Sequence, residues 1–165
     1  MPQSPKTPLE TLLSGPMLPG KLVWIGLRPQ RHLPPLTPAS AVLIAEHGLE
    51  GDHYRTSRNG GRQVTLISSE DLGAIASFLG RDHISPGTLR RNFVTEGINL
   101  LALKGRRFWV GSALVESSGD CAPCSRMETA LGPGGYNAVR GHGGITAKII
   151  KGGSVHLGDV IRRAD

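Results

Sequence analysis

The chain contains few of the residues on which several protein classes depend. Only two of its 165 residues are cysteines, Cys121 and Cys124, which is too few for the disulfide framework of a small secreted domain. No apolar run approaches the roughly 18 residues of a membrane helix, and residues 1–20 lack the apolar segment of a signal peptide. We therefore expect a cytoplasmic protein without a membrane partner, whose cysteines are thiols.

Aromatic side chains are also scarce, with three Phe, two Trp and two Tyr. They are scattered along the sequence, so they form no stacking platform for single-stranded nucleic acid. Positive charge is in excess, with 19 Lys and Arg against 13 Asp and Glu, a net charge of +6. This excess suits an anionic ligand or an acidic partner, or it is only a solvated surface. We do not expect nucleic-acid binding.

Short β-branched runs bounded by glycine recur along the chain. They predict strands at residues 21–27, 40–46, 62–68, 92–97, 106–111 and 112–119, and two or three more within residues 145–163, with breaks at Gly152-Gly153 and Gly158-Asp159. Such spacing is typical of a mainly β domain, built as a closed or half-closed barrel with a few short helices. We expect a single domain over residues 21–165, preceded by a flexible, proline-rich leader at residues 1–20.

One helix stands out in the sequence SSEDLGAIASFLG. Ser68 and Asp71 have the spacing of a capping box, and Gly80 ends the helix. The apolar residues Leu72, Ile75, Ala76 and Leu79 share one face. A second, shorter helix is expected to begin at Ser85-Pro86.

The two cysteines form a Cys-x-x-Cys pair, which has several possible uses. A structural zinc site needs four ligands, but the chain has no second Cys-x-x-Cys and its histidines are widely spread. A thioredoxin-like redox pair belongs at the start of a helix, whereas this pair follows the strand predicted at 112–119. Spacing alone leaves two other interpretations open. The cysteines are either two thiols without a function in a loop, or one functional thiolate beside a second cysteine.

Arg90, Arg91 and Asn92 form a second group of interest. In an extended segment, residues two apart share a face, so Arg90 and Asn92 are expected on one side and Arg91 on the other. A guanidinium beside an amide could bind an oxyanion or a phosphate. The alternative is a surface strand with incidental charge.

Two glycine-containing segments carry further candidates. In HGLEGDHYR we expect Gly51 and Asp52 to shape a turn, while His53 and Arg55 are free to meet a ligand. Six glycines fall within residues 132–144, where backbone N–H groups could approach an anion, and Arg140 and His142 are the chemically active side chains. The spacing does not match a phosphate-binding loop of the nucleotide hydrolases, and a flexible connection is the alternative.

Taken in order, several segments resemble one known family. GLEGDHY, RQVTLIS, RRNFVTEGINLLALKGRRFWVGSALVE, CAPCSRME, RGHGGITAKII and GGSVHLGDVI together resemble the MOSC domain over residues 21–163. That domain occurs at the C-terminus of molybdenum cofactor sulfurases, in the mitochondrial amidoxime-reducing components, and as small stand-alone bacterial proteins. The resemblance implies a β-barrel-like MOSC fold and a small stand-alone member.

The resemblance also implies roles for individual residues. Cys124 lies at the position of the family's single key cysteine, which ligates molybdenum in the pterin cofactor, molybdopterin, and Cys121 is its neighbour. Arg90 and Asn92 match the family's Arg-x-Asn position and are expected to contact the cofactor, with Arg91 a weaker candidate. The remaining candidates, near the cofactor or on the substrate side, are His53 and Arg140. One thiolate suits a metal already held by pterin sulfurs, and the nearby Arg126 would favour that thiolate.

Two activities follow from the resemblance. The first is a molybdenum-dependent oxidoreductase that reduces small N-hydroxylated compounds with electrons from a separate donor protein. The second is a non-catalytic cofactor carrier or a sulfur-relay module, in which Cys124 takes a persulfide from a sulfur donor.

Overall fold

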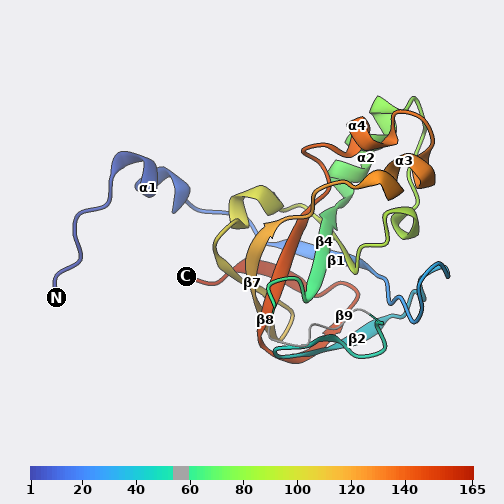
Figure 1. Cartoon of the computed structure of the whole chain (residues 1–165). Coiled ribbons are helices and arrows are strands. Elements are labelled where there is room, and N and C mark those ends of the chain that lie inside the picture. Colours follow the sequence, from blue (N-terminus) through green and yellow to red (C-terminus); the bar gives the residue numbers. More distant parts are fainter. Residues whose placement is uncertain (54–59) are drawn as a thin grey trace.

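A computed structural model describes residues 1–53 and 60–165. It is mainly β, as the sequence predicts, and its centre is a closed barrel of seven strands (Figure 1). The barrel strands are β1 (Gly20–Ile25), β4 (Val64–Ser68), β5 (Phe93–Glu96), β6 (Arg107–Val110), β7 (Ala113–Asp120), β8 (Ile145–Lys151) and β10 (Val160–Arg163). Each corresponds to a predicted strand, and the breaks after β8 and before β10 fall at the predicted glycines.

The strand order around the barrel is β1-β10-β6-β7-β8-β4-β5, and β5 pairs with β1 to close it. All neighbouring strands are antiparallel except β4 and β5. A parallel pair needs a crossover connection, and the helix α2 (Ser69–Phe78) supplies it. A small sheet with the order β3-β2-β9 lies at one end of the barrel (Figure 1). Its strands are β2 (Ser40–Ile44), β3 (Gly48–Leu49) and β9 (Gly153–His156).

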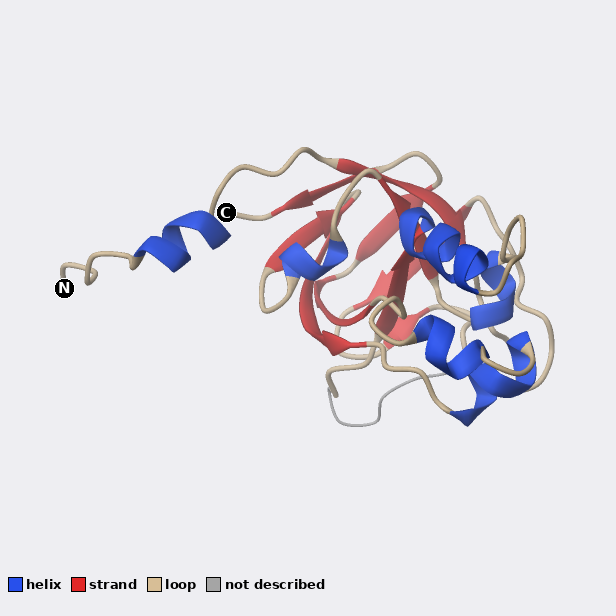
Figure 2. Cartoon of the chain, turned by 90° about the horizontal axis from the view of Figure 1, so that it is seen from above, coloured by secondary structure: helices blue, strands red, loops and turns tan. Residues whose placement is uncertain are grey.

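The helices gather at the opposite end of the barrel from the small sheet (Figures 1 and 2). They are α2, α3 (Ser125–Leu131) and α4 (Gly135–Val139), with 3₁₀ turns η1 (Pro86–Leu89) and η2 (Leu100–Leu103) nearby. The helix predicted after Ser68 is α2, and the Ser68 hydroxyl accepts a hydrogen bond from the Asp71 N–H at 3.0 Å. The helix expected at Ser85-Pro86 is the single turn η1. The sequence did not predict α3 or α4.

Residues 1–20 contain a further short helix, α1 (Pro8–Leu13), which lies apart from the barrel and buries none of its residues (Figure 1). None of the helices in the described part of the chain is long and apolar enough to cross a membrane.

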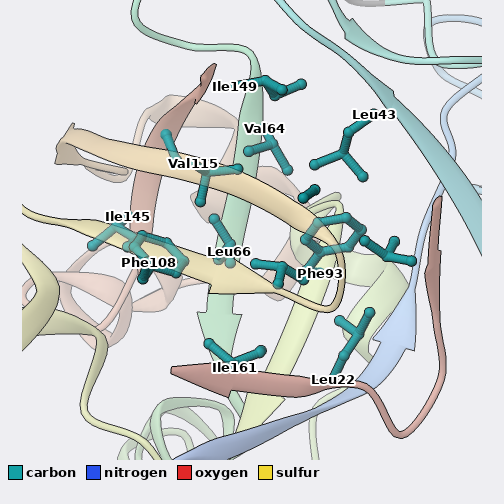
Figure 3. Close-up of a cluster of buried hydrophobic side chains, with 14 of the residues drawn as sticks. Leu22, Leu43, Val64, Leu66, Phe93, Phe108, Val115, Ile145, Ile149 and Ile161 are labelled. Atoms are coloured by element: carbon teal, nitrogen blue, oxygen red, sulfur yellow. The ribbon is translucent and has the colours of Figure 1, made fainter. Parts of the chain in front are cut away.

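Two clusters of apolar side chains form the core. The first fills the barrel around Phe93 and Phe108, both fully buried, together with Leu22, Leu66 and Val115 (Figure 3). The second lies between the barrel wall and the helices. All five residues of β4 are buried, because one face of this strand meets the barrel interior and the other meets the helices. The helical end of the barrel is therefore firmly packed, and it positions the loops that carry the candidate residues.

Candidate functional site

Two cavities open on either side of the segment Cys121–Cys124, which we call the cysteine segment. One, the arginine pocket, has a volume of about 370 Å³ and is lined by Cys124. The other, the glycine-loop pocket, has a volume of about 630 Å³ and is lined by Cys121 and the loop Gly141–Gly144. The two cysteines of one short motif thus serve different cavities.

Cys124 is exposed and is placed at the start of a helix. It follows β7 by a short loop and is the N-cap residue of α3, with extended backbone and no capping hydrogen bond from its side chain. The Met127 N–H donates to the Cys124 carbonyl at 2.9 Å and fixes the first turn. Among the described residues the thiol has no hydrogen-bond partner, and it is exposed where it lines the arginine pocket, so a ligand or a partner can reach it.

Cys121 has the opposite environment. It is only 2% exposed, and its N–H donates to the Gly144 carbonyl at 2.9 Å, which extends the pairing of β7 with β8 by one step. Neither cysteine is in a disulfide. Within the described residues no three His, Cys, Asp or Glu side chains cluster to hold a metal, so this part of the chain offers no support for a structural zinc site.

Six arginines give the arginine pocket its charge: Arg28, Arg31, Arg62, Arg90, Arg91 and Arg126. His32 and His53 also line it, and no Asp or Glu does so among the described residues. The Arg126 guanidinium makes no hydrogen bond or ion pair with any other described residue. A concave surface with this many guanidinium groups and no carboxylate concentrates positive potential, and it is suited to bind an anion.

Asp52 lies just outside the pocket and neutralises one of these arginines. Its carboxylate accepts hydrogen bonds from Arg28 Nη2 at 2.8 Å, Nε at 3.1 Å and the backbone N–H at 2.7 Å. The pair is buried, with side-chain exposures of 9% and 1%. Asp52 therefore has a structural role, but its carboxylate bonds the distant Arg28 and not the amides of its own turn. Arg28 Nη1 in turn donates to the Arg90 carbonyl at 3.1 Å, so the ion pair holds two sides of the pocket together.

Arg90 adopts the left-handed conformation (φ 56°, ψ 33°) after the turn η1. The extended geometry expected for residues 90–92 is therefore wrong, because the strand begins only at Phe93. The Arg90 guanidinium donates to the carbonyls of Leu33 and Gln30. Burial lowers the pKa of Arg90, and repulsion from Arg28 lowers it further, while Asp52 opposes both effects.

Asn92 does not share a face with Arg90. It is fully buried, its Oδ1 accepts from the Thr65 N–H at 3.0 Å and the Thr65 hydroxyl at 3.2 Å, and its Nδ2 donates to the Gly26 carbonyl at 3.2 Å. The side chain ties β4 to the end of β1. The structure therefore places Asn92 behind the pocket wall and not on its surface.

Arg91 is buried between the two pockets. Its guanidinium donates to three carbonyls, those of Gly143 at 3.0 Å, Leu89 at 2.8 Å and Cys121 at 3.5 Å. Burial lowers its pKa, and the neighbouring cysteines Cys121 and Cys124 act in the opposite direction. This buried cation holds η1, the cysteine segment and the glycine loop in place.

The other predicted residues divide between the two pockets. His53 lines the arginine pocket, and its Nδ1 lies 2.7 Å from the Arg28 carbonyl. Arg140 lines the glycine-loop pocket, away from Cys124. His142 lies with it and is 2.8 Å from Asp71 through Nδ1. Arg55 lies outside the described residues.

Sequence reasoning missed Arg28, Arg31 and His32, which belong to the loop after β1. The only signal was the run of basic residues in LRPQRH, next to the proline that ends the strand. It also missed that a helix begins directly after Cys124. The structure supplies the helical context that a redox pair would need, but it exposes only one of the two thiols.

Comparison with known proteins agrees with this architecture. The model of the MOSC domain family matches residues 44–162. The YUAD protein from Bacillus subtilis is similar in structure, with 20% identity, a TM-score of 0.76, and coverage of 87% of this chain and 94% of that one.

Two further solved structures share the fold. YiiM from Geobacillus stearothermophilus has 16% identity and a TM-score of 0.71, over 88% of this chain and 75% of its own. YiiM from Escherichia coli has 18% identity and a TM-score of 0.67, over 88% and 70%. A search of curated protein sequences gives no match. At such low identities these likenesses show a shared fold.

Proposed function

The chain belongs to the MOSC domain family, and on this premise we propose that the arginine pocket binds the molybdenum cofactor, with Cys124 as the protein ligand of molybdenum. One observation carries the proposal. The unbonded, exposed thiol of Cys124 shares a cavity with six arginines and with no carboxylate of the described residues. A cofactor that brings its own dithiolene sulfurs and a terminal phosphate needs one soft ligand and a cationic surface, and these residues fit both needs.

The arginines have different tasks in this proposal. Arg126 has no partner among the described residues, so its guanidinium is available for phosphate oxygens. Arg90 lies beside Arg28, and the repulsion between them would be relieved by a bound anion. The Arg91 guanidinium already donates to three carbonyls, so its role is to hold the wall of the pocket in place. Asn92 acts indirectly, by holding Gly26 and Thr65.

The reaction that we propose is the reduction of a small N-hydroxylated compound, R–NHOH + 2e⁻ + 2H⁺ → R–NH₂ + H₂O. When bound, the cofactor supplies the two-electron chemistry that breaks the N–O bond. A separate donor protein supplies the electrons. Protons must come from the protein or from water, and His32 and His53 are the imidazoles in the pocket. Because a carbonyl only accepts, the contact with Arg28 assigns the proton to Nδ1 of His53 and leaves Nε2 to exchange the proton.

Activity measurements test this proposal. Protein expressed in a host that makes the cofactor is expected to reduce an amidoxime or a hydroxylaminopurine when a reductase supplies electrons. Cys124→Ala is expected to abolish turnover, whereas Cys121→Ala, the matched control from the same motif, keeps it. Full turnover in a cofactor-free preparation, or in Cys124→Ala, would contradict the proposal.

The exposure of Cys124 favours a second candidate, sulfur relay. A partner's persulfide R–S–SH would be attacked by the Cys124 thiolate, the outer sulfur would move to give Cys124–S–SH, and R–S⁻ would leave. Incubation with a cysteine desulfurase and cysteine, followed by intact mass measurement, tests this. Relay predicts a gain of one sulfur in the wild type and in Cys121→Ala, but not in Cys124→Ala. No gain in the wild type would exclude relay.

A further inference from the structure

The glycine-loop pocket is the larger of the two cavities that flank the cysteine segment, at about 630 Å³, and the proposed function does not use it. Its volume falls in the range of small-molecule sites. Arg91 and the cysteine segment separate it from the arginine pocket, because the Arg91 guanidinium is bonded to Gly143 on one side and to Leu89 on the other. A ligand here would therefore be independent of the proposed cofactor.

The pocket is lined by two carboxylates and one guanidinium, and only the guanidinium lacks a partner among the described residues. Asp71 and Asp120 line it, but both carboxylates already have partners: Asp71 bonds His142 at 2.8 Å and Ser68 at 3.0 Å, and Asp120 pairs with Lys104 at 3.2 Å. Arg140 is exposed, and its guanidinium has no hydrogen bond or ion pair with any described residue. A guanidinium without a counter-ion at the wall of a cavity is a site for an anion.

Backbone donors add to that charge. Gly141, Gly143 and Gly144 line the cavity, and none of their N–H groups donates to another residue in the described part of the chain. Gly143 is itself buried, where an unpaired donor is costly. Free amides in a glycine loop are a common way of binding an anionic group, and here they flank the amide of His142, which is bonded to Val139. A Cβ at Gly143 would lie 2.2 Å from the Cys121 carbonyl oxygen, so only glycine keeps this loop in place.

Apolar side chains form the rest of the wall. Leu100, Leu101, Pro123 and Tyr136 line the cavity, and Leu101 and Tyr136 are 64% and 42% exposed. Apolar groups left open around a cavity favour a ligand with an apolar body. The pocket therefore combines a cationic, amide-rich end with a surface suited to an aromatic or aliphatic group.

We propose that the glycine-loop pocket binds a small organic anion, a carboxylate or a phosphate ester, through Arg140 and the free amides of the Gly141–Gly144 loop, with the apolar body of the ligand against Leu101 and Tyr136. The inference rests on the charge, the donors and the shape of this pocket alone, and it stands whether or not the arginine pocket binds molybdenum.

A ¹⁵N–¹H NMR titration of the whole chain tests the proposal. The probes are phenylphosphate and benzoate, with inorganic phosphate, benzyl alcohol and benzylamine as controls. At least one aromatic anion is expected to shift the amide signals of Gly141, Gly143 and Gly144 in a saturable way, and the stronger of the two identifies the head group. Inorganic phosphate has no apolar group, so it is expected to bind about tenfold more weakly than the aromatic anion.

Matched variants locate the site. Arg140→Ala is expected to weaken the aromatic anion about tenfold or more, because one charge-assisted contact is lost. Arg126→Ala removes from the other pocket an exposed arginine whose guanidinium is also without a partner among the described residues, and it is expected to leave the affinity unchanged. The absence of saturable shifts with both aromatic anions, equal binding of benzyl alcohol or benzylamine, or equal losses in the two variants would overturn the proposal. The spectrum of each variant also reports whether it is folded.

Discussion

The arginine pocket and the glycine-loop pocket share a wall but differ in almost every chemical property. The first has an exposed thiol and six arginines. The second has a buried thiol, two acids that are already paired, one unpaired arginine and an apolar side. The difference shows that a two-residue spacing between cysteines does not make them one site, because Cys121 is buried beside the glycine-loop pocket whereas Cys124 is exposed in the arginine pocket.

The largest effect is expected from a change in the glycine loop, which the Cys121 N–H joins to the cysteine segment through the Gly144 carbonyl. Gly144 has φ +85°, and a Cβ there would lie 1.9 Å from the Leu66 carbonyl oxygen. Gly144→Ala is therefore expected to cost more than about 4 kcal/mol of unfolding free energy and to disrupt both pockets. Gly141→Ala is the matched control, since its φ is +80° but nothing lies within 4 Å of the added carbon. It should cost only about 1–2 kcal/mol. Thermal unfolding followed by circular dichroism measures both, and equal losses would show that crowding at Gly144 is unimportant.

The second effect concerns the buried cation between the pockets. Arg91→Met removes the donor to the carbonyls of Gly143, Leu89 and Cys121, and we expect a loss of about 2–4 kcal/mol. Arg126→Met is the control and should change stability by less than about 0.5 kcal/mol, because that side chain is exposed. Urea unfolding distinguishes the two. Similar stabilities of both variants would mean that Arg91 is not what joins the pockets.

A smaller effect should separate the two thiols by reactivity. Cys124 is exposed and Cys121 is 2% exposed, so alkylating reagents should modify Cys124 first. The arginines should also make the anionic reagent iodoacetate a few-fold more reactive toward Cys124, relative to neutral iodoacetamide, than toward a free cysteine peptide. The preference should fade near 1 M salt, where the screening length is about 3 Å, and should fall in Arg126→Gln. Peptide mapping by mass spectrometry measures it, and a preference that is insensitive to salt would rule out an electrostatic origin.

The smallest effect is a pH dependence at α2, the helix that carries Asp71 to the glycine-loop pocket. Burial alone would raise the pKa of Glu70, but the N–H of Gly97 and further hydrogen bonds outweigh it and hold the pKa below its ordinary value of 4.5. Its contribution to stability is therefore complete above that value and is lost as the pH falls through the lower pKa of the folded state. Glu70→Gln should cost a few tenths of a kcal/mol at pH 7, about 0.3–0.5, and less at an acidic pH below the lowered pKa of the folded state. Urea unfolding at both pH values checks it, and an equal cost at both would exclude the titration of Glu70.

Much of the barrel could be predicted from the sequence, because the strands are short β-branched runs that end at glycine. The capped helix α2 could be predicted equally well, since Ser68 and the spacing of Leu72 and Ile75 are local signals. The helices α3 and α4 gave no such signal. They have seven and five residues, and neither has a side-chain cap.

The candidate site was less predictable, for a physical reason. The resemblance to the MOSC domain pointed to Cys124, and His53 could be singled out by residue type; both line the arginine pocket. The left-handed turn at Arg90 depends on η1 and reverses the faces that an extended strand would give. The convergence of Arg28 and Arg126 on one cavity arises from the closure of the barrel, which no local pattern of residues encodes.

The most direct measurement is the molybdenum and pterin content of the wild type, Cys124→Ala and Cys121→Ala, all purified from a host that makes the cofactor. Elemental analysis gives the metal, and the fluorescence of the oxidised pterin gives the organic part. We expect near-stoichiometric metal in the wild type and in Cys121→Ala, and its loss in Cys124→Ala. Equal metal in all three proteins, or neither metal nor pterin in the wild type, would contradict the assignment of Cys124 as the molybdenum ligand.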